Sequence, residues 1–164
     1  MPDSSLVMYE EESRLINAEL SKLHQQTNAQ ATFLVDKNGQ LIASIGENKN
    51  LDTTSLASLT AGNIAATGGM AKLLGEKEFS ILFHEGEKDN IHISLIGQRV
   101  ILVVIFDHRS SLGLVRLRVK KSVEILAQIF EQLAQKAETA KVSKPTSKSP
   151  FAEITEEDIE KLFG

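Results

Sequence analysis

Residues 52–75, DTTSLASLTAGNIAATGGMAKLLG, have the start and stop signals of an α-helix. Asp52, Thr53 or Thr54 can cap the first turn, and Gly75 stands where a left-handed residue commonly ends a helix. An interior glycine costs a helix about 0.5–1 kcal/mol relative to alanine, so the glycines inside this stretch need a compensating contact. The close approach of another backbone would provide one, from a sheet, from a second copy of the helix or from a partner protein.

Small and large side chains occupy different sides of this predicted helix. At 100° per residue the small ones fall on one stripe about 80° wide, whereas Leu56, Leu59, Met70, Leu73 and Leu74 lie off it. We therefore expect the large residues to face the core and the stripe to be an interface; packing of the stripe against a sheet of the same subunit is the alternative. The stripe consists of Thr54, Ser58, Gly62, Ala65, Gly69 and Lys72. The flank expected nearest a twin helix consists of Ala57, Ala61, Ile64, Gly68 and Ala71.

The chain before residue 52 predicts a helix and a hairpin. Ile16, Leu20 and Leu23 recur at helical spacing within a helix at about 8–27. Two short apolar strands follow, ATFLVD at 31–36 and QLIASI at 40–45. The Asn38-Gly39 pair between them supplies the positive φ angles that a tight hairpin turn needs.

The chain after residue 75 predicts three strands and a long helix. The strands are 79–85, 91–96 and 100–106, and the last is apolar on both faces, so it should be central in a sheet. Ser110 or Ser111 then caps a helix. Its expected core face is Leu112, Val115, Val119, Val123, Leu126, Phe130 and Leu133. The order α-β-β-α-β-β-β-α predicts a three-layer α+β domain, with a five-stranded antiparallel sheet covered by one helix on one face and two on the other.

Composition limits the class of protein. At 164 residues and 18.0 kDa, with 41% hydrophobic and 24% charged residues, the chain suits one globular domain with tails. The longest apolar run, 100–106, is far shorter than the ~20 residues of a membrane span. The acidic N-terminus lacks a signal-peptide pattern, so we expect a cytoplasmic protein. There is no cysteine for disulfides or thiolate metal sites, and the net charge of −4 argues against nucleic-acid binding.

The composition changes at the end of the predicted domain. Residues 1–139 form the domain, 140–149 read as a flexible polar linker, and 150–164 as an acidic amphipathic segment. Such a segment on a tether is typical of a ligand that lays an apolar face into a groove. A disordered acidic end, or packing on the protein's own sheet, is the alternative. Its apolar residues are Phe151, Ile154, Ile159, Leu162 and Phe163.

The strand at 79–85 predicts a second interface. Ile81, Leu82 and Phe83 would form an exposed apolar edge, which soluble proteins normally avoid. Pairing of this edge with its twin would cover it. We therefore predict dimerisation here, with an ordinary edge strand as the alternative.

Other chemistry-bearing residues form no recognised catalytic or metal signature. His24, His84, His92 and His108 make neither a helical i,i+4 pair nor an HExxH motif, although His84 and His92 could meet across neighbouring strands. Residues 68–72 lack the spacing of a phosphate loop. We favour a solvated face for the basic residues and keep Arg109, in a predicted loop, as the one candidate for an arginine supplied in trans to the active site of a partner. The others are Arg116, Arg118, Lys120 and Lys121.

Five stretches carry a resemblance that covers nearly the whole chain. They are FLVDKNGQLI at 33–42, LASLTAGNIAATGG at 56–69, FHEG at 83–86, VILVVIFDHRSSLGLVRLRVKK at 100–121 and SPFAEITEEDIEKLFG at 149–164. They resemble the Roadblock (dynein light-chain roadblock) family, and within it the bacterial members that partner a Ras-like small GTPase of the MglA type. The likeness includes positions outside the core, such as 52–55 and 111–113.

The resemblance implies a homodimer whose sheets join edge to edge through the third strand, with the two helices 52–75 side by side. This shared face would bind the GTP-loaded GTPase and accelerate hydrolysis without inserting an arginine, and GTP and magnesium would belong to the partner. The tail would make a second contact that affects nucleotide exchange. A role in gliding motility and cell polarity, and a location at a cell pole, are implied as well.

The implied GTPase-binding residues are Ser58, Gly62, Ala65, Gly69 and Lys72, although the residues alone leave open which of them meet a twin helix. Two other functions stay open: a scaffold or adaptor dimer without effect on GTP turnover, and a small-ligand sensor domain. None of the three requires a cofactor or a catalytic residue of the chain itself.

Overall fold

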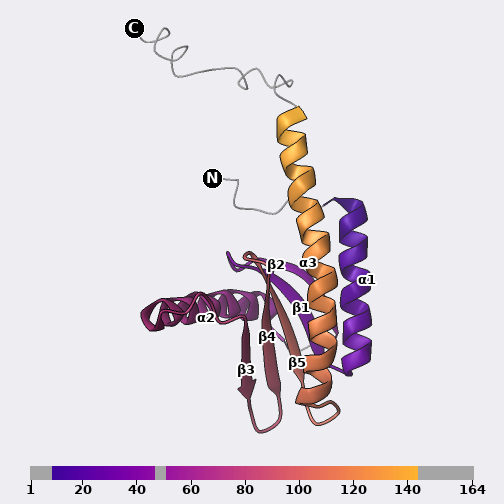
Figure 1. The fold of residues 1–164 in the computed structure, drawn as a ribbon. Helices are drawn as coiled ribbons and strands as arrows, with labels where there is room; N and C mark the ends of the chain where they lie inside the picture. The colour runs from indigo at the N-terminus through magenta and orange to yellow at the C-terminus, as the bar shows by residue number, and fades with distance from the viewer. Residues whose placement is uncertain (1–8, 47–50, 144–164) are drawn as a thin grey trace.

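The computed structural model describes residues 9–46 and 51–143. Its elements follow the predicted order, which confirms the three-layer α+β fold (Figure 1). They are α1 (Glu10–Thr27), β1 (Ala31–Asp36), β2 (Leu41–Gly46), α2 (Thr53–Leu74), β3 (Ile81–Glu85), β4 (Asn90–Ile96), β5 (Val100–Phe106) and α3 (Leu112–Ser143). The third strand starts at Ile81 rather than at Phe79.

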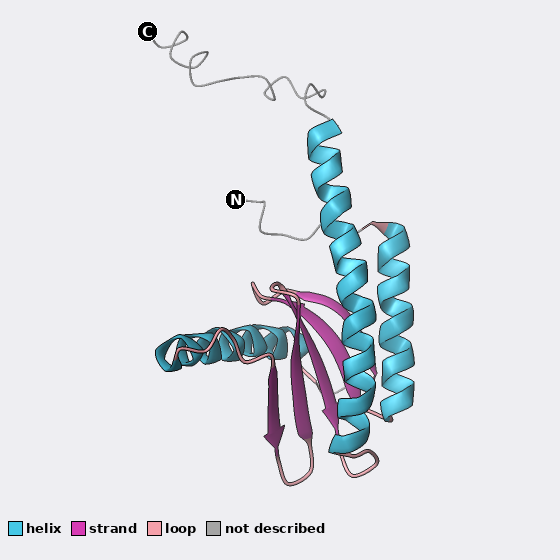
Figure 2. Cartoon of the chain, viewed as in Figure 1, coloured by secondary structure: helices cyan, strands magenta, loops and turns pink. Residues whose placement is uncertain are grey.

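One antiparallel sheet separates two hydrophobic layers. Its strand order is β2-β1-β5-β4-β3, so the all-apolar β5 lies at the centre, buried along its whole length, as predicted. Alternate residues of β5 serve the two faces: Val103 belongs to the cluster under α2, and Val104 to the cluster under α1 and α3. Figure 2 shows the single α2 on the side of the sheet opposite to α1 and α3.

The larger core lies beneath the antiparallel pair α1 and α3. Ile16, Leu20 and Leu23 of α1 have no exposed surface, and they pack with the predicted apolar face of α3. Ser122 Oγ of α3 donates a hydrogen bond of 2.7 Å to the Glu19 carboxylate of α1. This layer therefore has the regular amphipathic packing that the 3.6-residue period predicted.

The predicted signals at the ends of α2 are present. The Asp52 carboxylate accepts hydrogen bonds from Ser55 N (3.0 Å) and Ser55 Oγ (2.7 Å), and these bonds lower the pKa of Asp52. At the other end Gly75 has φ +77°, and Glu76 N donates to Ala71 O at 2.8 Å. A capped start and a left-handed glycine stop therefore define this helix.

The helix α3 runs further than its sequence pattern indicated. Leu114 N donates to Ser111 Oγ at 3.2 Å, so Ser111 caps its first turn. At the other end the helix continues to Ser143, beyond residue 139 where the predicted domain ended. The remainder of the linker and the predicted tail contact, Phe151, Ile154, Ile159, Leu162 and Phe163, lie outside the described residues.

Candidate protein interface

The helix α2 faces the sheet through Ala57, Ile64 and Ala71 and exposes most of its large apolar residues. Ala57 and Ala71 have no exposed surface, and Ile64 is 7% exposed. In contrast Leu59 is 70% exposed and Leu73 is 89% exposed. The prediction that the large apolar residues supply the core face was therefore wrong for Leu59, Met70, Leu73 and Leu74; Leu56 alone of that group packs, in part, against the core.

The physical reason is the bulk of the sheet beneath α2, which already fills most of this layer. A helix that rests on a sheet through alanine can approach more closely than one that rests on leucine, and Ile64 alone then fills the remaining space. The strands beneath supply the bulk, through Phe33, Ile101 and Ile105. The size of the apolar side chains of α2 therefore did not indicate which side of the helix faces the sheet.

The flank predicted to meet a twin helix is directed at the chain's own sheet instead. Ala57 and Ile64 belong to the core cluster of this layer, and Ala71 is fully buried as well. These three side chains are therefore unavailable to a second subunit. Ala61 and Gly68, beside them, are half-buried and lie at the margin of the surface.

The small stripe is exposed along its length. All six of its residues, from Thr54 to Lys72, are open to solvent. A Cβ atom built on Gly62, Gly68 or Gly69 would meet nothing within 4 Å. The described part of the subunit does not need these glycines for its own packing, which removes the alternative that the stripe packs on the same subunit's sheet.

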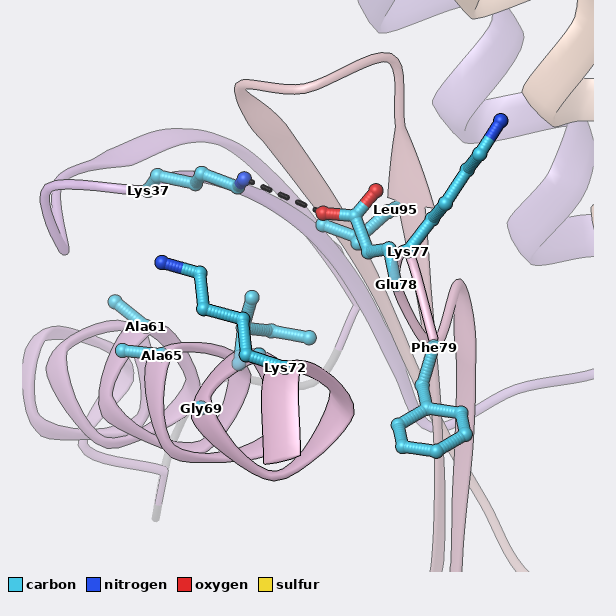
Figure 3. A pocket seen from close by; sticks show the side chains of 11 residues that line it. Lys37, Ala61, Ala65, Gly69, Lys72, Lys77, Glu78, Phe79 and Leu95 are labelled. Atoms are coloured by element: carbon cyan, nitrogen blue, oxygen red, sulfur yellow. Dashed lines mark ion pairs between the residues drawn. The ribbon is translucent and has the colours of Figure 1, made fainter. Parts of the chain in front are cut away.

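A groove of about 420 Å³ runs beside the stripe. Its lining from α2 is mostly small, and the large apolar residues that line it are Ile64, Phe79 and Leu95; the small residues are Ala61, Ala65, Gly68 and Gly69. Figure 3 shows the ion pair between Lys37 and Glu78, 3.6 Å long, spanning the space above α2, with Lys72 rising from the helix. The groove therefore combines small side chains of α2 with the cationic side chains of Lys37, Lys72 and Lys77.

A second apolar surface faces away from the sheet. We call Leu59, Met70, Leu73 and Leu74 the outer ridge of α2; their exposed fractions are 70%, 58%, 89% and 69%. Large contiguous apolar surface on a soluble protein marks an interaction site. In Figure 1 the C-terminal end of α2 extends beyond β3, so the part of the outer ridge in the last two turns, from Met70 to Leu74, lies near that edge of the sheet.

The strand β3 is an open edge, as predicted. It pairs with β4 on one side only, and Ile81 is 52% exposed. Leu82 and Phe83 are half-buried, because Leu82 packs toward α2 and the Phe83 ring stacks on Phe106, with 6.1 Å between the ring centroids. Another strand could therefore pair with the backbone of β3 and contact the side chain of Ile81.

Comparison with known proteins identifies the domain. The profile of the Roadblock/LC7 domain matches residues 15–106, more than half of the chain. The chain belongs to the Roadblock/LC7 family. It is 62% identical to MglB of Myxococcus xanthus over 78% of this chain and 96% of that one, with a TM-score of 0.74. None of the curated proteins compared with it matches.

Two further MglB structures have similar coverage. The gliding protein MglB of Thermus thermophilus is 35% identical over 78% of this chain and 97% of its own, with a TM-score of 0.74. An MglB solved in a tetrameric arrangement is 34% identical over 79% and 97%, with a TM-score of 0.75. The resemblance seen in the sequence is confirmed.

The histidines of this Roadblock domain do not converge. Phe83 pairs with His92 across β3 and β4, whereas His84 pairs with Ile91, so His84 and His92 point to opposite faces and the prediction that they could meet was wrong. Burial, with a smaller effect of the Arg116 charge, lowers the pKa of His92 to about 4. The His84 ring instead bonds Asn63 of α2 at 3.1 Å. Within residues 9–46 and 51–143, no three His, Asp or Glu side chains lie close enough to hold a metal ion.

Arg109 serves the loop in which it lies. Its Nε is 3.1 Å from Asp107 Oδ1, and this contact lowers the pKa of Asp107. The Arg109 carbonyl accepts a hydrogen bond from Asn28 Nδ2 at the end of α1. Figure 1 places the loop between β5 and α3 at the opposite end of the sheet from α2. Within the parts that the structure describes, no helix is both long and apolar enough to cross a membrane.

Proposed function

We propose that this protein is a homodimeric regulator that binds a bacterial Ras-like GTPase of the MglA type and stimulates its GTP hydrolysis. The observation that carries the proposal is the exposed stripe of α2, where the described residues place no atom within 4 Å of a Cβ added to Gly62 or Gly69. Identity of 62% to Myxococcus xanthus MglB supports the choice of partner class. The assigned contacts are Ser58, Gly62, Ala65, Gly69 and Lys72.

The homodimer rests on two exposed apolar features. The open edge of β3 can pair with the same strand of a twin, which would continue the sheet and cover Ile81. The C-terminal part of the outer ridge of α2 lies near that edge and can then meet the twin's helix. The tetrameric arrangement of a 34% identical MglB supports self-association in this branch of the family.

Stimulation proceeds by differential binding, without a catalytic residue from this chain. The dimer face fits the GTPase conformation in which the switch loops and catalytic groups are correctly placed, and so raises its population. Arg109 takes no part as an arginine finger, because it is bound to Asp107 in the loop between β5 and α3, at the end of the sheet away from α2. GTP and magnesium belong to the partner.

The tail makes a second contact with the same GTPase. A tethered segment acts at high effective concentration, so its apolar residues add affinity once the first contact has formed. This second contact affects nucleotide exchange. The role is in gliding motility and cell polarity, in the cytoplasm and at a cell pole.

One pair of variants tests the α2 contact. Ala65→Arg with Gly69→Arg places two long charged side chains on the stripe without entering the core, because both positions are exposed. We expect loss of GTPase stimulation and an intact dimer by light scattering. The matched control, Ala18→Arg, adds a charge to the exposed face of α1 and should preserve stimulation.

The results also separate the alternative functions. Full stimulation by the double variant would contradict the assignment of the stripe. Tight binding of the wild-type protein to the GTPase without any change in hydrolysis rate would favour the scaffold or adaptor instead. Deletion of residues 144–164 should weaken binding or exchange effects without unfolding the domain.

A further inference from the structure

A basic and apolar surface lies on the face opposite to α2. Leu117, Lys121 and Ile125 of α3 are spaced by four residues, so they form one row along the helix. Leu117 is 55% exposed and Ile125 is 39% exposed, and Leu15 of the neighbouring α1 is 45% exposed. We call this surface, including Arg118 and Lys120, the α1–α3 seam. Figure 1 shows the two helices side by side along it.

The positive charge of the seam is concentrated in a short part of α3. Four basic residues fall within the six positions 116–121, and no acidic residue interrupts them. Within the described residues none of the four forms an ion pair, whereas Lys136 at the other end of α3 is paired with Glu12 at 2.7 Å. Arg118 Nε is covered and has no hydrogen-bond partner there. A protein with a net charge of −4 thus presents an unpaired cationic surface with leucine and isoleucine in it.

The chain contains a segment that complements this surface. Residues 151–164 hold five acidic residues and one lysine, which accounts for the whole net charge of the protein. The same fourteen residues include two phenylalanines, two isoleucines and a leucine. The carboxylates of this segment can meet the basic residues of the seam, while its apolar side chains cover Leu15, Leu117 and Ile125. The match concerns both charge and hydrophobicity, as in helix-in-groove recognition.

The length of the intervening chain allows this contact within one subunit. At 1.5 Å per residue, the described helix α3 runs about 27 Å from Ile125 to Ser143. Residues 144–150 and their two flanking bonds span at most about 28 Å when extended. Phe151 can therefore return to the level of Ile125, and the following residues then lie beside 116–121. A return along α3 brings the acidic residues to the basic ones, and not to the glutamates at the start of α1.

We propose that the acidic segment 151–164 docks on the α1–α3 seam of its own subunit when no GTPase is bound. This inference goes beyond the proposed function, because the docking itself requires no GTPase. It adds a regulatory step where the proposed function holds: the tail leaves the seam before it contacts the GTPase.

A spin label on the tail of the full chain tests the docking. The protein has no cysteine, so Thr155→Cys gives a single attachment site. We expect the label to broaden the amide NMR signals of residues 114–125, and we expect high salt to reduce the effect, since screening weakens exposed charge pairs. Lys120→Glu with Lys121→Glu should abolish the broadening. The control, Lys77→Glu with Lys88→Glu, makes the same charge change on exposed residues of two loops and should preserve it.

Three results would overturn the proposal. The first is absence of broadening on the seam, or broadening on the sheet or α2 instead. The second is broadening only in mixed samples where label and isotope are on different chains, which would place the tail on the twin. The third is absence of broadening together with binding of the full chain to phosphatidylserine vesicles through Lys120 and Lys121, which would assign the seam to a membrane. A GTPase that fails to respond to this protein would affect none of these readouts, so the two proposals fail separately.

Discussion

Replacement of Gly69 by alanine separates the stability of α2 from its function. Gly69 is exposed in the interior of a 22-residue helix, and an added Cβ would meet nothing within 4 Å. The helix should gain about 0.5–1 kcal/mol, because alanine loses less backbone entropy on folding. For a chain of this size that gain raises the melting temperature by about 1–4 °C.

Gly62→Ala should behave in the same way, because its surroundings are equally open. The two positions are seven residues apart, about 10 Å along the helix, so their effects should add to about 1–2 kcal/mol in the double variant. Both alanines should nevertheless reduce GTPase stimulation, since a methyl group on the stripe holds the partner's backbone away. Gly113→Ala in the first turn of α3 is the control: its Cβ also meets nothing within 4 Å, and stimulation should be unchanged.

The measurements are thermal unfolding of the full chain, light scattering for the dimer, and GTP hydrolysis by the partner GTPase. A lower melting temperature for Gly69→Ala would refute the reasoning about open space, and would indicate that the twin subunit fills it. A more stable variant with full stimulation would show that the stripe makes no close contact with the GTPase. Only greater stability combined with weaker stimulation supports the assignment.

Four further predictions concern other parts of the fold. Gly46→Ala should destabilise the domain by more than about 1–3 kcal/mol in urea unfolding, because φ is +118° and the new Cβ would lie 2.8 Å from His24 Cε1. Burial lowers the pKa of His92 from 6.5 to about 4, so the folded state binds this proton more weakly than the unfolded state does. The free energy of unfolding should therefore fall by roughly 3 kcal/mol as the pH drops from 6.5 to 4. His92→Gln should remove this pH dependence. Ile81→Lys places a charge on the open edge of β3, and a dimer that persists at low micromolar concentration would argue against edge pairing. Arg109→Ala should preserve GTPase stimulation, whereas loss of an arginine finger would reduce it by ~10³-fold or more.

Much of the fold was predictable because the relevant signals are local. The hydrophobic period of 2 or 3.6 residues located the five strands and three helices, and β1 and β5 have the predicted bounds. The Asp52 cap and the left-handed Gly75 are properties of a few adjacent residues, so they too were visible in the sequence. The all-apolar β5 could only be central, since both of its faces must be buried.

The orientation of α2 was not predictable in this way. Its sequence separates small side chains from large ones on different sides of the helix. Burial, however, depends on which of these sides lies against the sheet and how closely. Phe33 and Ile101, far away in the sequence, already fill that layer, so the sheet accepts Ala57 and leaves Leu73 outside. The separation of His84 from His92 likewise depends on strand register, which a single strand does not specify.

The sequence by itself determined the elements, their order, the caps of α2 and the resemblance to the Roadblock family. Only the tertiary structure decided that the stripe of α2 is open, that its large residues form an outer ridge, and that exposed residues of α1 and α3 join into one basic seam. The physical reason is that secondary structure follows from neighbours along the chain, whereas exposure follows from the packing of segments far apart in it.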